Sequence, residues 1–172
     1  MTDLNQPGDV FIPPAEKPKI PSGINVLTIL TFIGSGIGIL GSIYGFISAK
    51  SSLDKMEATI NSPEYENMPS IAKKFMSPEA LEIARKSYEN RVPINLINII
   101  AIVLCIMGAL QMRKLKAQGY SLYVIGELLP LVGSAVFLGM SFLTGMSGII
   151  TICFILLFII LYTTQRKYLI NK

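Results

Sequence analysis

The sequence contains no histidine among its 172 residues. This absence excludes histidine-based haem or zinc ligation, Ser-His hydrolysis and any proton relay through an imidazole ring. The two cysteines, Cys105 and Cys153, fall inside apolar runs, where cysteine behaves as a small hydrophobic residue and a disulfide is not expected. The apolar runs also hold no paired carboxylates, no metal-ligand cluster and no nucleophile beside a base. We therefore expect a protein that is not an enzyme and has no catalytic, cofactor-binding or metal-binding residues.

Charged residues are also scarce. They make up 15% of the chain, whereas a soluble domain usually carries about a quarter. Hydrophobic residues make up 51%, the mean hydropathy is +0.55, and the charges cluster in short blocks between long apolar runs. The net charge of +4 does not indicate a nucleic-acid partner, because no basic patch is interleaved with aromatic residues. These features predict an integral membrane protein.

Four apolar runs are long enough to cross a hydrocarbon core of about 30 Å, which takes roughly 20 helical residues. The predicted fold is all-α and polytopic, with four transmembrane helices and a short helical loop outside the cytoplasm between the first two. The predicted segments are a Pro-rich cytoplasmic tail at 1–23, the first span at 24–48, the extracytoplasmic loop at 49–92, the second span at 93–112, a basic cytoplasmic loop at 113–119, the third span at 120–143, the fourth span at 147–163 and a basic cytoplasmic tail at 164–172.

Basic residues indicate the orientation of these spans. Four spans put both termini on one side together with the loop 113–119, and Lys and Arg favour the cytoplasmic side. The loop 49–92 holds as many acidic as basic residues, so its net charge is zero. We expect both termini inside a bacterial inner membrane. The residues expected to set this topology and to meet lipid headgroups are Arg113, Lys114, Lys116, Arg166 and Lys167.

The loop 49–92 carries two similar helix starts, Ser-Pro-Glu at 62–64 and again at 77–79. In each, Ser can cap the helix, Pro suits the first turn and Glu is favoured by the helix dipole. After the second start, one apolar face is formed by Leu81, Ala84 and Tyr88. Helices this short are not stable alone in water. We expect this face to lie on the bundle end, on the bilayer interface or on a partner protein.

Small residues recur at intervals of four in the first two spans. Such stripes let transmembrane helices approach closely, since lipid gives no hydrophobic drive to their association. We expect the stripes to form the internal seam between the first two spans, with a second small face left for a helix of another subunit. The residues are Gly34, Gly38 and Ser42, the pair Gly41 and Gly45, and in the second span Ala101, Cys105 and Ala109. Asn95 and Asn98 open the second span and are expected to bond across helices or to line a polar cavity.

Glu127 is the one acidic or basic side chain well inside a span. Pro130 removes the amide that would bond to the Gly126 carbonyl, so Gly126, Glu127 and Pro130 together predict a kink with a free carbonyl beside a carboxylate. Both groups accept hydrogen bonds, and three uses remain open. We expect first that Glu127 snorkels or pairs with the basic rim and clamps the last two spans. The candidate donors in the chain are Arg113, Lys114, Lys116, Arg166 and the hydroxyls of Tyr120 and Tyr123. The other two uses are a donor from a partner subunit and a proton- or cation-handling site.

The segment 112-MRKLKAQGYSLYVIGELLP-130 resembles an element of small four-span inner-membrane proteins of Bacteroidota-type bacteria, which have no assigned activity. The first span, 26-VLTILTFIGSGIGILGSIYG-45, is similar to theirs as well. The resemblance covers about half of the chain and implies a bacterial inner-membrane location. It implies no functional residue.

These features favour a non-enzymatic accessory or scaffold subunit of a larger inner-membrane complex for secretion or insertion, respiration or transport. The alternative is a small homo-oligomeric channel or carrier, coupled to protons or cations through Glu127. The expected partners are membrane lipids and other integral membrane subunits. The sequence identifies no small-molecule substrate and no cofactor.

Overall fold

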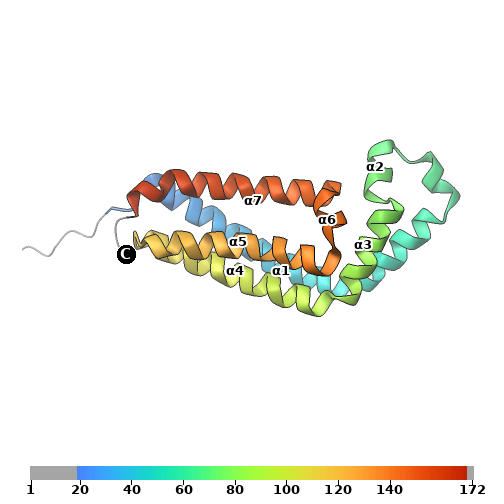
Figure 1. The fold of residues 1–172 in the computed structure, drawn as a ribbon, viewed down its shortest axis with the longest axis horizontal. Coiled ribbons are helices and arrows are strands. Elements are labelled where there is room, and N and C mark those ends of the chain that lie inside the picture. Colours follow the sequence, from blue (N-terminus) through green and yellow to red (C-terminus); the bar gives the residue numbers. More distant parts are fainter. Residues whose placement is uncertain (1–18, 170–172) are drawn as a thin grey trace, which may run out of the picture.

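The computed structural model describes residues 19–169, and all regular elements in this range are helices. Most of the Pro-rich tail therefore lies outside the described residues, as do the last three residues of the basic C-terminal tail. Four helices are long and apolar enough to cross a membrane: α1 (Ser22–Ile60), α4 (Arg91–Arg113), α5 (Ala117–Leu138) and α7 (Met146–Gln165). They form an elongated bundle, with the shorter helices gathered at one end (Figure 1). The all-α four-span prediction is confirmed.

Helix α1 does not end at Ser48, where the first span was expected to stop. It continues to Ile60 and is 39 residues long, about 58 Å at 1.5 Å per residue. No proline or glycine interrupts residues 46–60, so nothing in the chain breaks the helix as it leaves the apolar part. The expected loop 49–92 therefore begins as a helical extension of α1, which projects past the other spanning helices (Figure 1).

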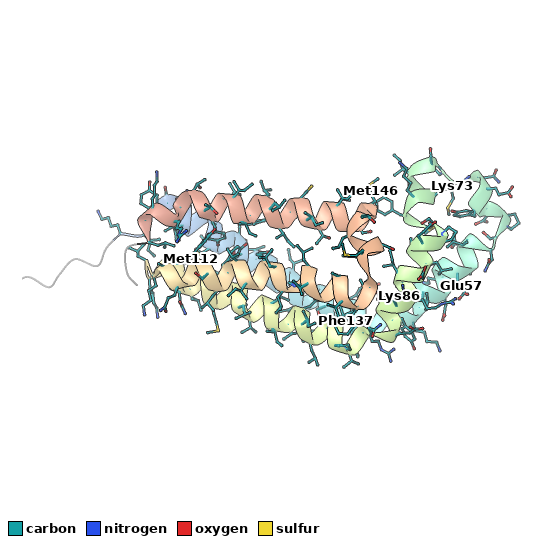
Figure 2. All side chains as sticks on the ribbon, viewed as in Figure 1. Glu57, Lys73, Lys86, Met112, Phe137 and Met146 are labelled. Carbon is teal, nitrogen blue, oxygen red and sulfur yellow. The ribbon has the colours of Figure 1, made fainter. Side chains whose placement is uncertain are left out.

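The remainder of that loop forms η1 (Pro63–Asn67), α2 (Ser70–Phe75) and α3 (Pro78–Glu89). Helix α3 packs against α1 and also contacts α5 and α6. Leu81, Ala84 and Tyr88 are each half-buried, and Arg85 pairs with Glu57 of α1 at 3.2 Å. Of the three expected supports for this face, the structure shows the end of the bundle. Figure 2 places Glu57, Lys73 and Lys86 at that end.

The two Ser-Pro-Glu starts behave differently. The Ser77 hydroxyl accepts a hydrogen bond from the Ala80 amide at 3.2 Å, as expected of a helix cap. Ser62 precedes only a short 3₁₀ helix and makes no such bond to it; its hydroxyl donates instead to the Thr59 carbonyl at 2.8 Å. The Ser-Pro-Glu sequence therefore caps the start of α3 at 77–79, whereas at 62–64 its serine bonds to the end of α1.

Glycines bring α4 and α5 into close contact. A Cβ atom on Gly108 would lie 2.7 Å from the Gly119 carbonyl oxygen, and one on Gly126 would lie 2.7 Å from the Cys105 Sγ. The expected seam between the first two spans is present at Gly38, which packs on Ile102 of α4, whereas Ala101 and Cys105 pack on Gly126 of α5. Ala109 is fully buried.

The connection between the last two spans also differs from the expectation. Helix α5 ends at Leu138, because Gly139 adopts φ 87°, a left-handed conformation that glycine reaches readily. A short helix, α6 (Met140–Thr144), then leads to α7. The third span was expected at 120–143, whereas α5 covers 117–138 and the short helix α6 occupies the end of the expected span.

The buried core lies at the end of the bundle that holds both ends of the described chain. Ile24, Met112, Tyr123 and Tyr162 are each at most 1% exposed and come from α1, α4, α5 and α7. Figure 2 shows Met112 at this end and Met146 at the opposite one. All four spanning helices therefore meet tightly at one end.

Candidate functional site

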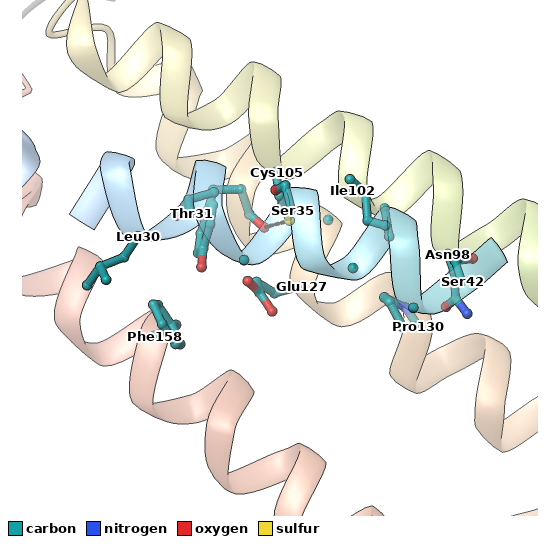
Figure 3. A pocket seen from close by; sticks show the side chains of 16 residues that line it. Leu30, Thr31, Ser35, Ser42, Asn98, Ile102, Cys105, Glu127, Pro130 and Phe158 are labelled. Atoms are coloured by element: carbon teal, nitrogen blue, oxygen red, sulfur yellow. Dashed lines mark hydrogen bonds between the residues drawn. The ribbon is translucent and has the colours of Figure 1, made fainter. Parts of the chain in front are cut away.

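A cavity of about 450 Å³ lies between the spanning helices, beyond the buried core. Its walls come from all four of them (Figure 3). The lining is rich in glycine and short polar side chains, with apolar side chains around them. The residues are Leu30, Thr31, Gly34, Ser35, Gly38, Gly41, Ser42, Asn98, Ala101, Ile102, Cys105, Tyr123, Gly126, Glu127, Pro130 and Phe158.

Glu127 reaches this cavity because of its place on α5. Gly126 is buried against α4, and successive residues of a helix are rotated by about 100°. Glu127 is thereby turned away from the α4 contact, and its carboxylate projects into the space between α1 and α7 (Figure 3). Pro130 lines the same cavity one turn later. The structure thus brings the three expected residues to one site.

The expected clamp between Glu127 and the basic rim is not formed. Within residues 19–169 the ion pairs are Arg85–Glu57 and Lys86–Glu82, both in the helices outside the spans. The Arg166 guanidinium lies over the Tyr120 ring, 5.4 Å from its centroid. The Tyr120 hydroxyl in turn shares a 2.8 Å hydrogen bond with Thr163. At this end of the bundle α5 is therefore bonded to α7 through Tyr120 rather than through Glu127.

Hydroxyl and amide groups cross between helices on both sides of Glu127. Thr31 of α1 and Tyr162 of α7 share a buried hydrogen bond of 2.7 Å. Ser42 of α1 donates to the Asn95 side chain of α4, so the expected interhelical use of Asn95 is confirmed. Asn98 lines the cavity, which was the other expected use, and Asn95 lines the adjoining one as well.

The cavity reaches the apolar surface of the bundle along α1. Leu30, Gly34 and Gly41 line it and are also exposed. A second cavity of about 230 Å³ shares Gly41, Ser42 and Asn98 with the first, includes Gly45, and extends toward Arg91. The Arg91 guanidinium lies 4.4 Å from the Tyr88 ring centroid and donates to the Tyr88 carbonyl at 3.1 Å. Gly34, Gly41 and Gly45 of α1 therefore line open space, whereas Gly38 and Ser42 contact α4.

Tyr123 was one of the expected donors to Glu127, and it lines the same cavity one turn before Glu127 on α5. Other residues of the site could not be found from the sequence. Nothing in the sequence pairs Thr31 with Tyr162, or brings Phe158 opposite Glu127, because these contacts depend on how α7 returns to α1.

The predicted topology residues lie at the end of the bundle where the core is buried. Arg113, Lys114 and Lys116 occupy the end of α4 and its connection to α5, whereas Arg166 and Lys167 follow α7. Gly23, at the start of α1, packs on the Gln165 side chain at the end of α7. The basic groups of these two segments therefore lie at the same end of the bundle as the start of α1.

The arrangement supplies one carboxylate, several hydroxyls and an amide in an apolar surrounding. Within residues 19–169, no group of three or more Cys, Asp or Glu side chains lies together in a way that could hold a metal ion. Fold and site define a multi-pass, all-α membrane protein with four spans and a cavity between them. Comparison with family models, with curated proteins and with solved structures gives no match.

Proposed function

We propose that the protein is a non-enzymatic accessory subunit of a larger bacterial inner-membrane complex, bound through helix α1. The observation that carries this proposal is the open space around the glycines of α1. No atom lies within 4 Å of a Cβ built on Gly34, Gly36, Gly41 or Gly45. Exposed glycines in a spanning helix favour close approach of another helix, which gains packing that lipid cannot supply.

The glycines of the other helices support a role of the α1 glycines in binding a partner helix. Gly108, Gly119 and Gly126 are each in contact with a neighbouring helix of the same chain. At these three glycines the chain's own helices pack closely, whereas Gly34, Gly36, Gly41 and Gly45 of α1 have no such neighbour. Gly34 and Gly36 differ by about 160° around α1, counting roughly 100° per residue. One symmetric contact between two copies covers only one of these sides, which favours an assembly with further subunits.

The proposal is tested by purification from the native membrane in mild detergent. We expect a larger integral membrane protein to co-purify in fixed stoichiometry, and Gly41→Ile to remove it while leaving the melting temperature of the isolated subunit unchanged. Val136→Ile is the matched control, because Val136 is 71% exposed on α5. A wild-type protein that runs alone as a monodisperse homo-oligomer would contradict the proposal.

A second candidate function is a small cation- or proton-coupled carrier, which is favoured by the position of Glu127 in the cavity. The test is ion flux in reconstituted vesicles, compared between the wild type and Glu127→Gln. Glu127→Gln should abolish the flux. An equal flux in both proteins, or no flux in the wild type, would remove this candidate.

A further inference from the structure

We propose that the cavity around Glu127 is a binding site for a lipophilic organic cation, with one positive charge on an apolar body, that enters from the bilayer. This site goes beyond a role as an accessory subunit, because it requires no partner protein. The argument rests on the size of the cavity, its charge, its aromatic residues and its opening.

The size and the lining suit a small molecule. Ligand pockets usually enclose about 300–1,000 Å³, and this cavity encloses about 450 Å³. Its walls are mainly apolar or formed by glycine, with polar groups at a few points such as Ser35 and Asn98. Such a lining binds an apolar body by contact and fixes its orientation through few polar atoms.

The charge of the lining selects a cation. Glu127 is the one charged residue among those that line the cavity. The apolar segments 24–48, 93–112, 120–143 and 147–163 contain no Lys, Arg or His at all. A carboxylate in an apolar surrounding is costly unless a positive charge or hydrogen-bond donors accompany it. The cavity wall supplies hydroxyl and amide donors such as Ser35 and Asn98, but neither the wall nor the same segments of a second copy supply a positive charge. A cationic ligand would supply it.

Aromatic side chains add a second attraction for a cation. Tyr123 of α5 and Phe158 of α7 line the cavity. Figure 3 shows Phe158 and Glu127 projecting toward the same space between α1 and α7. The face of an aromatic ring attracts a positive charge within about 6 Å, and the attraction strengthens when water is excluded. A diffuse organic cation can therefore interact with the carboxylate and a ring together.

The opening distinguishes an organic cation from a metal ion. Leu30, Gly34 and Gly41 line the cavity and are exposed on the apolar surface of α1. A ligand that passes this surface must partition into lipid, which a hydrated ion does not. Calcium also prefers six to eight oxygen ligands, and magnesium an octahedral set, whereas the cavity offers one carboxylate.

The test is equilibrium binding of radiolabelled tetraphenylphosphonium to the purified full chain in lipid nanodiscs. We expect saturable binding, and we expect Glu127→Gln to weaken it at least tenfold while Glu127→Asp retains most of it. Glu89→Gln is the matched control, because Glu89 is exposed on α3. The neutral analogue triphenylphosphine oxide should not compete. An unchanged elution profile and melting temperature would show that each variant is folded.

A second variant tests the cavity without changing its charge. Gly34→Phe should place a ring in the opening, where no atom lies within 4 Å of the new Cβ, and should also abolish binding. Equal binding by the wild type and Glu127→Gln, equal competition by the neutral analogue, or no saturable binding would each overturn the proposal. These results do not test the proposed accessory-subunit function, because the assay contains no partner protein.

Discussion

The Tyr162 hydroxyl lies 2.7 Å from the Thr31 hydroxyl, and this buried contact joins the last spanning helix to the first. The Tyr162 ring also packs on Tyr123 of α5, with 4.2 Å between the ring centroids and 47° between the ring planes. Tyr162 thus fixes α7 against two other helices at the end of the bundle. Beyond this contact α7 stands apart from α1, and the cavity lies in the space between them.

Replacing Tyr162 by Phe should lower the free energy of unfolding by about 0.6–1.7 kcal/mol, the range for hydrogen bonds between transmembrane helices. The lower end is expected, because the Thr31 hydroxyl can instead bond to a carbonyl in its own helix. Unfolding in mixed detergent micelles measures the change. Tyr44→Phe serves as the control, since Tyr44 is 74% exposed, and an equal loss in both variants would contradict this role of Tyr162.

The spans could be predicted from the sequence, because length and apolar composition decide whether a helix can cross a bilayer. The ends were harder to predict. The chain stays helical beyond Ser48 because no helix-breaking residue is present. Helix α5 ends at Gly139, whose left-handed φ depends on tertiary packing as well as on the local sequence. The spacing of the glycines indicates which residues permit close packing, but it does not indicate which helix packs against them.

The same limit applies to the site. Glu127 and Pro130 were predictable because a carboxylate and a proline inside an apolar run are both costly and therefore noticeable. The surroundings of Glu127 were not predicted correctly. A basic loop close in sequence suggested a salt bridge, whereas the direction of the Glu127 side chain is set by the packing of Gly126 on Cys105.

Replacing Gly108 by Ala should destabilise the bundle by about 1–3 kcal/mol, as expected of overpacking. The added methyl group would lie 2.7 Å from the Gly119 carbonyl oxygen and 2.8 Å from the Tyr123 amide nitrogen, and neither backbone can yield independently. Gly36→Ala is the matched control, since a Cβ there meets no atom within 4 Å and alanine favours a helix. Thermal unfolding in detergent compares them. Stability equal to the wild type in Gly108→Ala would refute the close contact between α4 and α5.

Replacing Ser77 by Ala should destabilise α3 by about 1 kcal/mol through loss of its cap. A hydrogen bond with the Ser77 hydroxyl also lowers the pKa of Glu79 below its ordinary value. A lowered carboxyl pKa contributes stability above the pKa of the unfolded chain, and that contribution is lost as the pH falls through the folded-state pKa. In Ser77→Ala the Glu79 pKa should therefore rise. Carboxyl carbon NMR measures it, and Ser62→Ala, at the start that lacks the cap, should leave it unchanged.

The predicted orientation, with both termini in the cytoplasm, determines which residues should react from outside the cell. A cysteine at Glu64 should react with a membrane-impermeant maleimide on intact cells, whereas one at Lys116 should react only after lysis. The native Cys105 is buried, and Cys153 lies within the apolar part of α7, so both are poor targets for this reagent. Reaction of the Lys116 cysteine on intact cells would reverse the orientation.

Binding of a partner helix and binding of an organic cation should oppose each other. Gly34 and Gly41 form both the open face of α1 and part of the cavity lining, so a helix lying on them covers the opening. Linkage requires that each ligand weaken the other by the same factor. Saturating tetraphenylphosphonium should therefore weaken binding of the purified partner, as measured by fluorescence anisotropy in nanodiscs. Glu127→Gln should remove this effect and leave partner binding otherwise intact. An affinity that does not change with the cation, in a protein that binds both, would mean that the partner lies elsewhere on α1.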